Sequence, residues 1–438
     1  MFTSLKEFYK FRIYKAYLRL LHEHILVRRR YTLGLENLPA QGERYFIACN
    51  HQNTANDPLN IVFALPLKLN VFALARANVF SVHPLITRYL HWIGLLPAYR
   101  FGWEGGEGLE HNFQTFDDIA ERVNAGFPVI VFPEAGHTQG HYLDPFTTGL
   151  VRMAFHAARA NGFTEDIKIV PTAHHYEDYV DMQTDFVWRI GEPISLKPYY
   201  EAYQQHPNSV MRNITRELRQ RIHAMMLDEG KEDYEEKDFL RRSTLNPSTL
   251  QAMPLPQRME ADQRFIDALR SHPDYDEIIN NARQLRAREQ ALGIDEHTIA
   301  AQPHWLSTLA WTVLLILLLP LYIVCLWPHG LCYAFPPMLM KTDKMFKNSY
   351  RTILSLVILY PLTAVLTFLV LGAVWGWWWQ ALVWILLWIP TGRFAWWYHY
   401  RIRLVRRAYN YLRASRQELG EIAHLHTLIQ SRIHTPHE

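Results

Sequence analysis

The sequence contains few cysteines, since only Cys49, Cys325 and Cys332 occur among its 438 residues. A disulfide-stapled secreted fold is therefore not expected. An uninterrupted apolar run is also missing near the N-terminus, where charges such as Lys6 and Lys10 break the pattern. A secretory signal is not expected for that reason, and we expect the large N-terminal part of the chain to lie in the cytoplasm.

Charged residues are absent from two long segments. No Asp, Glu, Lys or Arg occurs from Trp305 to Met340, or from Thr352 to Gly392. A membrane-spanning helix needs about 20 apolar residues, and each segment is far longer than that. The sequence therefore predicts an integral membrane protein, with residues 305–399 forming transmembrane hairpins that cross three to four times.

The basic residues lie beside these apolar segments. Residues 1–30 hold eight Lys or Arg against two acids, and residues 393–417 hold seven Arg and no acid. Because basic flanks mark the cytoplasmic side, they favour a hairpin in each apolar segment, with the basic loop Lys341–Arg351 also inside. The turn of the second hairpin is expected within Gly372–Gln380. Three crossings stay open because Pro320 shortens the second leg of the first hairpin.

Three further regions have a helical composition. Residues 1–34 predict a basic amphipathic interfacial helix, with the helix proper over residues 4–27. The alternative is an ordinary amphipathic helix packed on the domain. Residues 231–304 predict a charged helical connector, and residues 400–438 predict a basic cytoplasmic tail helix.

Short apolar runs rich in β-forming residues alternate with helical stretches between residues 35 and 230. The expected strands are Arg44–Cys49, Asn70–Arg76, Pro128–Phe132, Ile167–Thr172 and Asp185–Ile190. A helix over Asn208–Leu227 follows them. This alternation predicts an α/β domain over residues 35–230, with a mostly parallel sheet flanked by helices, followed by the helical connector and the C-terminal helical transmembrane region.

His51 and Asp57 follow the first of these strands. His51 lies at the carboxyl end of the strand, where α/β sheets place their ligands. Asp57 directly precedes Pro58, which is typical of a residue that caps a helix N-terminus. The pair is thus either a loop histidine with a helix cap or a general base with its orienting carboxylate.

Other strand ends carry polar groups that are expected at the same crevice. Gly94 begins a turn that leads to Arg100, and the next strand ends in Phe132, Pro133 and Glu134, followed by Gly136. A further strand contains Pro171. A base, a carboxylate and an arginine at one sheet edge fit O-acylation of a phosphate-bearing alcohol.

The order of these motifs resembles the glycerolipid acyltransferase family, which includes 1-acylglycerol-3-phosphate and glycerol-3-phosphate O-acyltransferases. The motifs are Asn-His…Asp-Pro, Gly-x-x-Pro-x-x-Arg, Phe-Pro-Glu and Val-Pro, over roughly residues 35–200. The resemblance implies that His51 is the general base and Asp57 its partner. It assigns binding of the acceptor to a set of eight residues: Gly94, Arg100, Phe132, Pro133, Glu134, Gly136, His137 and Thr138. Pro171 would shape the fourth motif.

The resemblance further implies a reaction without a bound cofactor, in which the thioester of coenzyme A or of acyl carrier protein is the acyl donor. The expected acceptor is 1-acylglycerol-3-phosphate, with glycerol-3-phosphate or a lyso-aminolipid as alternatives, and membrane lipids are expected partners. Two departures from the family pattern stand out. Five residues, not four, separate His51 from Asp57, and no arginine follows Glu134 in the third motif. His137 and Arg152 are the candidates for that missing charge.

Competing interpretations remain open at this point. Cys49 allows a thiol mechanism, although a small residue inside a strand is usually core. A metal site from His137, His141 and Asp144, or from His174 and His175, matches no strong signature and is not expected. Nucleic acid is not an expected partner, because the cations lie beside apolar segments. A non-catalytic membrane scaffold that retains the fold is the rival from a different class; a transporter is disfavoured by the lack of polar groups in the apolar segments.

Overall fold

The computed structural model describes residues 5–98, 105–134, 136, 140–244, 253–339 and 344–433. Its N-terminal half is built on an eight-stranded sheet with the order β1-β7-β6-β2-β5-β3-β4, and β8 pairs with β6. The strands are β1 Val27–Leu33, β2 Tyr45–Cys49, β3 Phe72–Arg76, β4 Leu95–Ala98, β5 Val129–Val131, β6 Lys168–Tyr176, β7 Thr184–Ile190 and β8 Ile194–Ser195. Among the strand pairs of the described residues, β6–β7 and β6–β8 are antiparallel and the others are parallel. The predicted α/β class with a mostly parallel sheet is confirmed.

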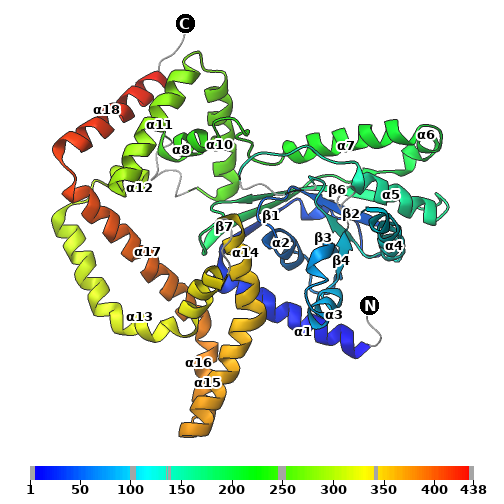
Figure 1. The fold of residues 1–438 in the computed structure, drawn as a ribbon, viewed down its shortest axis with the longest axis horizontal. Helices are drawn as coiled ribbons and strands as arrows, with labels where there is room; N and C mark the ends of the chain where they lie inside the picture. Colours follow the sequence, from blue (N-terminus) through cyan, green and yellow to red (C-terminus); the bar gives the residue numbers. More distant parts are fainter. Residues whose placement is uncertain are drawn as a thin grey trace.

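Helices cover both faces of the sheet (Figure 1). They are α1 Leu5–Leu21, α2 Asn56–Ala64, α3 Pro84–Trp92, α4 Gly105–Asn124, α5 Gly149–Ala160, α6 Tyr200–Gln205 and α7 Pro207–His223, with short turns η1 His22–Leu26, η2 Leu35–Asn37, η3 Ala77–Val79 and η4 Lys197–Tyr199. Side chains alternate along β2, as strand geometry requires. Phe46 belongs to the core cluster that contains Phe155 of α5, whereas Ile47 belongs to the second cluster, which contains Ile61 of α2. Burial on both faces holds β2 rigidly at the centre of the sheet.

The segment assigned to the N-terminal helix is partly a strand: the chain is helical through Leu26, and the prediction was wrong from Val27 onward. Residues 27–33 form β1, which pairs in parallel with β7. The run of arginines hid this strand because an edge strand is only half buried and tolerates charge. Arg28, for example, projects to the carboxylates of Asp185 and Glu177, with nitrogen–oxygen distances of 2.7 and 2.6 Å. Strands β4 and β8 were not predicted either.

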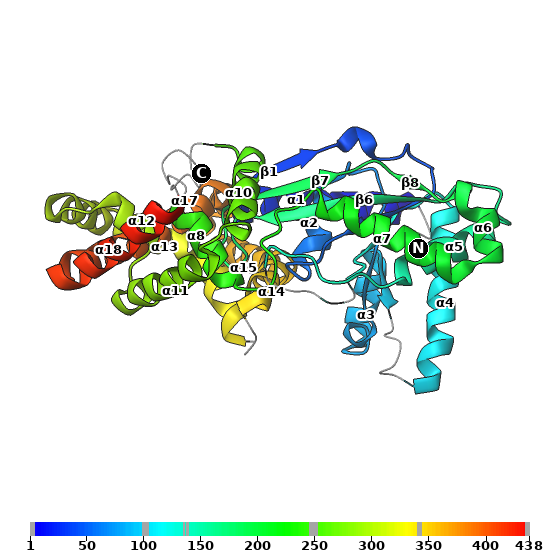
Figure 2. The ribbon, with the colours of Figure 1, turned by 90° about the horizontal axis from the view of Figure 1, so that it is seen from above.

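A helical part lies at the opposite end of the molecule from α4–α7 (Figure 2). It contains α8 Tyr234–Thr244, α10 Leu255–Arg270, α11 Tyr275–Leu292, α12 Glu296–Ala301, α17 Trp388–Arg413 and α18 Arg416–Ile433. The single tail helix expected over residues 400–438 is in fact divided. Ser415 and Glu418 exchange hydrogen bonds in a capping box that starts α18, and Ile422 and Leu425 then pack on α11.

Within the described part of the chain, two helices are long and apolar enough to cross a membrane: Trp305–Leu339, which is α13, and Lys347–Trp375. The second combines most of α14 Lys344–Leu354 with the π-helical turn η5 Ser355–Leu359 and α15 Tyr360–Trp375. Helix α16, Trp378–Leu386, returns alongside α15 (Figure 1) after a turn at Gly376, whose φ is +67°. Helix α13 is interrupted at Trp327, whose backbone angles are not helical.

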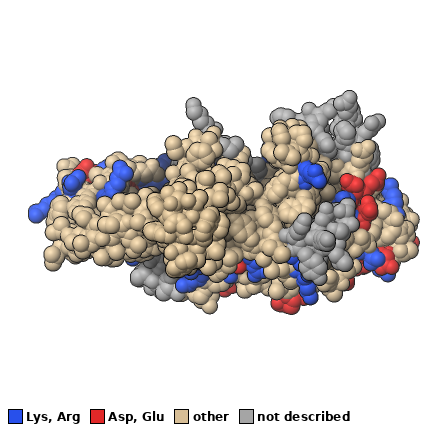
Figure 3. Space-filling model, turned by 90° about the horizontal axis from the view of Figure 1, so that it is seen from below, with Lys and Arg blue, Asp and Glu red and all other residues tan. Residues whose placement is uncertain are grey.

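The surface of these helices is apolar. Leu306, Leu317 and Leu386 are 81%, 72% and 73% exposed. Figure 3 shows a broad face without charged side chains on the side from which α13 and the α15–α16 pair are seen. The segment Lys341–Arg351 was expected to be a loop, but from Lys344 onward it is helix α14. That expectation was wrong because basic residues interrupt the apolar pattern without breaking the helix, and no Gly or Pro occurs there.

Candidate active site

The site begins where β2 ends. His51 follows this strand at a half-buried position, and its Nδ1 lies 2.7 Å from Oδ2 of Asp57. Strand β5 is the parallel neighbour of β2, so Phe132 leaves the sheet at the same edge. The Phe132 ring stacks on the His51 imidazole, with the ring centroids 4.2 Å apart and the planes inclined by 17°. The imidazole is therefore fixed by a hydrogen bond at one nitrogen and by a flat apolar contact across its face.

Asp57 is fully buried, and its two carboxylate oxygens accept hydrogen bonds from four groups. Oδ2 accepts from the His51 ring and, at 2.9 Å each, from the backbone N–H groups of Gln52 and Asn53. Oδ1 accepts from the hydroxyl of Tyr176 at 2.6 Å. Helix α2 has Ala55 as its N-cap residue, and no side chain caps it there. The Asp57 carboxylate therefore does not serve as the cap of α2.

The environment of Asp57 favours its charged form. Burial alone would raise the pKa of this carboxyl, but the hydrogen bond from His51, the charge of nearby histidines and the bond from Tyr176 outweigh it. The pKa of Asp57 consequently lies below its ordinary value. An ionised carboxylate at Nδ1 keeps the proton of the neutral imidazole on that nitrogen, which leaves Nε2 as the basic atom.

Glu134 connects the histidine to the loop that follows β5. Its Oε1 accepts a 2.6 Å hydrogen bond from the backbone N–H of His51, and its Oε2 accepts one of 3.0 Å from that of Asp144. Burial raises the pKa of Glu134 to about 8, although both amide donors act in the opposite direction. The carboxyl group thus serves as a cross-link between two backbone segments at the sheet edge.

The remaining predicted residues occupy different settings. Gly94 lies in the turn between α3 and β4 at a φ of +90°, a conformation that suits glycine. The carbonyl of Pro133 accepts a hydrogen bond from the Thr147 N–H at 2.9 Å. Gly136 is half-buried, and Pro171 pairs with Ala48 inside the sheet. Arg100, His137 and Thr138 lie outside the described residues.

Several residues of the site were missed from the sequence. Tyr176 ends β6, and Tyr179 follows it with its hydroxyl 3.0 Å from Oε1 of Gln52. The Gln52 side chain also donates to the Gly140 carbonyl, at 2.9 Å. Tyr176 and Asp57 are 119 positions apart, so no local spacing could reveal their contact. The only available signal was that β6 brings polar side chains to the same edge as β2.

With this geometry established, the chain can be compared with known proteins. Residues 29–175 match the model of the family described as Acyltransferase. This part of the chain is an acyltransferase domain. The match confirms the resemblance to an acyltransferase family and the prediction of an acyltransferase enzyme. It begins within β1, ends within β6 and contains both His51 and Asp57.

No curated protein matches the sequence. Among solved structures, the chain is similar to the crystal structure of the 1-acyl-sn-glycerophosphate (LPA) acyltransferase PlsC from Thermotoga maritima. The two share 14% sequence identity, and the similarity covers 50% of this chain and 84% of that chain, with a TM-score of 0.35.

Cys49 is the last residue of β2 and lies next to the candidate site. Its side chain is fully buried and packs in the core cluster that also contains Ile47 and Trp188. Burial raises the pKa of the Cys49 thiol well above its ordinary value, which disfavours the reactive thiolate. The structure therefore gives no support to a covalent thiol mechanism.

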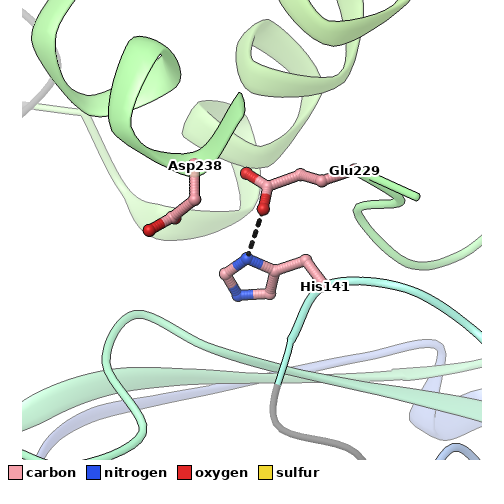
Figure 4. Close-up of side chains that lie close together, drawn as sticks. All are labelled: His141, Glu229 and Asp238. Carbon is pink, nitrogen blue, oxygen red and sulfur yellow. Dashed lines mark hydrogen bonds and ion pairs between the residues drawn. The ribbon is translucent and has the colours of Figure 1, made fainter. Parts of the chain in front are cut away.

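His141, one of the histidines considered for a metal site, has acidic partners from outside residues 29–175. His141 lies with Glu229 and Asp238 in a buried cluster (Figure 4), and its Nδ1 is 3.4 Å from Oε2 of Glu229. Both carboxylates of this cluster also bind the guanidinium of Arg241, which further binds Asp262. The guanidinium of Arg241 thus already balances the charge of these carboxylates, and the cluster is best described as an ion-pair network. The backbone N–H of His174 donates to Oδ1 of Asn50 at 2.7 Å, and burial lowers the pKa of the His174 imidazole to about 4.

Proposed function

We propose that this protein is a membrane-bound O-acyltransferase of glycerolipid synthesis. It transfers an acyl chain from the thioester of coenzyme A or acyl carrier protein to the hydroxyl of 1-acylglycerol-3-phosphate. The observation that carries the proposal is the His51–Asp57 pair at the end of β2, with a nitrogen–oxygen distance of 2.7 Å, inside a domain of the acyltransferase family. The order of the four motifs along the chain supports a glycerolipid as the acceptor.

The proposed reaction uses His51 as general base. Nε2 takes the proton of the acceptor hydroxyl as the oxygen attacks the thioester carbonyl, and Asp57 stabilises the imidazolium that forms. The carbon–oxygen bond forms, the carbon–sulfur bond breaks, and the leaving thiolate receives the proton from His51. The products are an ester and a free thiol, and no acyl-enzyme is needed.

The membrane region fits the substrates of this reaction. An acyl chain and a lysolipid acceptor both partition into a bilayer, so an enzyme anchored there meets them where they are concentrated. The uncharged face of α13 and of the α15–α16 pair, seen in Figure 3, supports insertion of these helices. The basic segments beside them support a cytoplasmic location for the acyltransferase domain.

Product analysis would test the proposed function. Membranes containing the full-length chain would receive a radiolabelled acyl thioester of coenzyme A or of acyl carrier protein, together with one acceptor at a time. The acceptors would be 1-acylglycerol-3-phosphate, glycerol-3-phosphate and a lyso-aminolipid. We expect a labelled diacyl phospholipid with the first acceptor. Product only with another acceptor would correct the substrate, and no product with any of the three would favour the non-catalytic scaffold.

A further inference from the structure

Helix α14 reaches the catalytic loop from the membrane region. This helix lies between the apolar segments α13 and α15 in the sequence, yet it lies beside the sheet domain in Figure 1. Its Ser349 is buried against the loop between His51 and Asp57. The contact joins residues that are almost 300 positions apart, since 296 positions separate Ser349 from Asn53.

The Ser349 hydroxyl uses its full hydrogen-bonding capacity on this one loop. It donates to the carbonyl of Asn53 at 2.7 Å, and it accepts from the hydroxyl of Thr54 and, at 3.4 Å, from the N–H of Asn56. A serine hydroxyl offers one donor and two acceptor positions, so every position is occupied. The same loop is one residue longer between His51 and Asp57 than the family pattern. Thr54 within it has a φ of +46°. An L-residue in this conformation needs support from its surroundings.

The loop in turn orients the catalytic carboxylate. The backbone N–H groups of Gln52 and Asn53 both donate to Oδ2 of Asp57, the oxygen that also binds His51. Ser349 therefore donates to the carbonyl of Asn53, and the N–H of the same Asn53 donates to Asp57. A displacement of Asn53 would alter the direction from which Oδ2 faces the imidazole.

A second contact fixes α14 in place. The guanidinium of Arg351 donates to the Val180 carbonyl of the sheet domain and to the Tyr333 carbonyl of α13, each at 3.1 Å. It also lies 4.2 Å from the centre of the Tyr333 ring. Helix α14 is thus fastened to both the sheet domain and the apolar helices, so it cannot shift relative to either without losing contacts.

We infer that Ser349 is a positioning residue for the reaction, through which the membrane region sets the geometry of the His51–Asp57 pair. This inference rests on the proposed function, because it assigns a role in that same site. It explains how a loop with an extra residue keeps a functional His–Asp distance. It also predicts that the apolar helices contribute to turnover and not only to anchoring.

The test compares three variants of the full-length protein in membranes. Ser349→Ala removes the hydroxyl, Ser349→Thr retains it, and Ser355→Ala is the matched control. Ser355 is also buried, and its hydroxyl donates to the Cys332 carbonyl of α13 at 3.0 Å, away from the catalytic loop. We expect Ser349→Ala to lower kcat by about 10- to 100-fold with little change in KM, because the acceptor site is intact while the base is misoriented. Ser349→Thr should recover most of the lost kcat, and Ser355→Ala should resemble the wild type.

A second readout does not depend on turnover. The rate at which diethyl pyrocarbonate modifies His51 would be followed by mass spectrometry of the His51 peptide. We expect this rate to rise several-fold in Ser349→Ala alone. Unchanged kcat and modification rate in Ser349→Ala, or equal losses in Ser355→Ala, would overturn the inference. If the wild type transfers no acyl group, the proposed function fails by itself, and the modification rate still decides whether Ser349 fixes the loop.

Discussion

The hydroxyl of Tyr176 lies 2.6 Å from Oδ1 of Asp57, on the carboxylate oxygen opposite the one that binds His51. The phenol and the imidazole are therefore hydrogen-bonded to the two different oxygens of one buried carboxylate. A second bond from Asn60 to the Tyr176 oxygen, at 3.0 Å, fixes the phenol in turn. The orientation of the His–Asp pair thus depends on β6 as well as on β2.

Tyr176→Phe should weaken catalysis while the fold persists. The substitution leaves a buried carboxylate oxygen without its donor, which costs about 1–3 kcal/mol. If the loss appears in the transition state, kcat/KM falls by roughly 5- to 150-fold. The pKa of Asp57 should also rise, because the Tyr176 bond helps to lower it. Kinetics over a range of pH would measure both effects. Tyr200→Phe is the control, since that hydroxyl accepts a 3.0 Å bond from Ile167 near the opposite end of the same strand; equal losses in both variants would contradict the account.

Asp57→Asn should cost much more than Tyr176→Phe. An amide presents one oxygen where the carboxylate presents two, and it no longer stabilises the charged imidazole or fixes its tautomer. We expect kcat to fall by about 10²- to 10⁴-fold with a small change in KM. The matched control is Asp166→Asn, because Asp166 also accepts from a hydroxyl and a backbone N–H, those of Ser195 and Lys197. Steady-state kinetics that show wild-type kcat in Asp57→Asn would exclude the proposed role.

Glu134→Gln should destabilise the protein, and more so at low pH. The amide nitrogen of glutamine cannot accept a hydrogen bond, so the N–H of either His51 or Asp144 loses its acceptor, at a cost of about 1–3 kcal/mol. Because the pKa of Glu134 is raised from 4.5 to about 8, the folded wild type holds a proton that the unfolded chain releases between these values. The free energy of unfolding of the wild type therefore falls as the pH rises through this window, whereas glutamine does not titrate.

Melting temperatures at pH 5 and pH 8 would measure this effect. We expect the difference in melting temperature between the wild type and Glu134→Gln to be smaller at pH 8 than at pH 5. A gap that widens as the pH rises would show that the carboxyl group is stabilised in its ionised form, contrary to the direction of the pKa shift.

The apolar helices should keep the protein in the membrane after peripheral contacts are removed. Washing membranes with alkaline carbonate breaks electrostatic binding but does not extract spanning helices, since each would expose a long apolar surface to water. We expect the full-length chain to remain in the pellet and to be released by detergent. Recovery in the carbonate supernatant would instead indicate a chain that is only adsorbed to the surface.

Much of the sheet could be predicted from the sequence, because β2, β3, β5, β6 and β7 are short apolar runs with clear boundaries. The sequence also predicted which strand ends carry His51 and Glu134, and the parallel pairing of β2 with β5 brings them to one edge. The edge strand β1 was missed because three consecutive arginines interrupt its apolar pattern; Arg28 and Arg29 are exposed, whereas Arg30 is half-buried and pairs with Glu23. Tyr176 and Ser349 were missed for another reason: their contacts with the catalytic loop depend on how distant elements pack, which periodicity does not encode.

The role of His51 is tested most directly by acceptor-dependent release of free thiol from the acyl thioester. His51→Ala is compared with His156→Ala, because His156 forms a similar pair with Asp117 at 2.7 Å on an exposed part of the surface. The account predicts that thiol release falls by about 10³-fold or more in His51→Ala and stays near the wild-type rate in His156→Ala. Undiminished release in His51→Ala would contradict the assignment of His51 as the base.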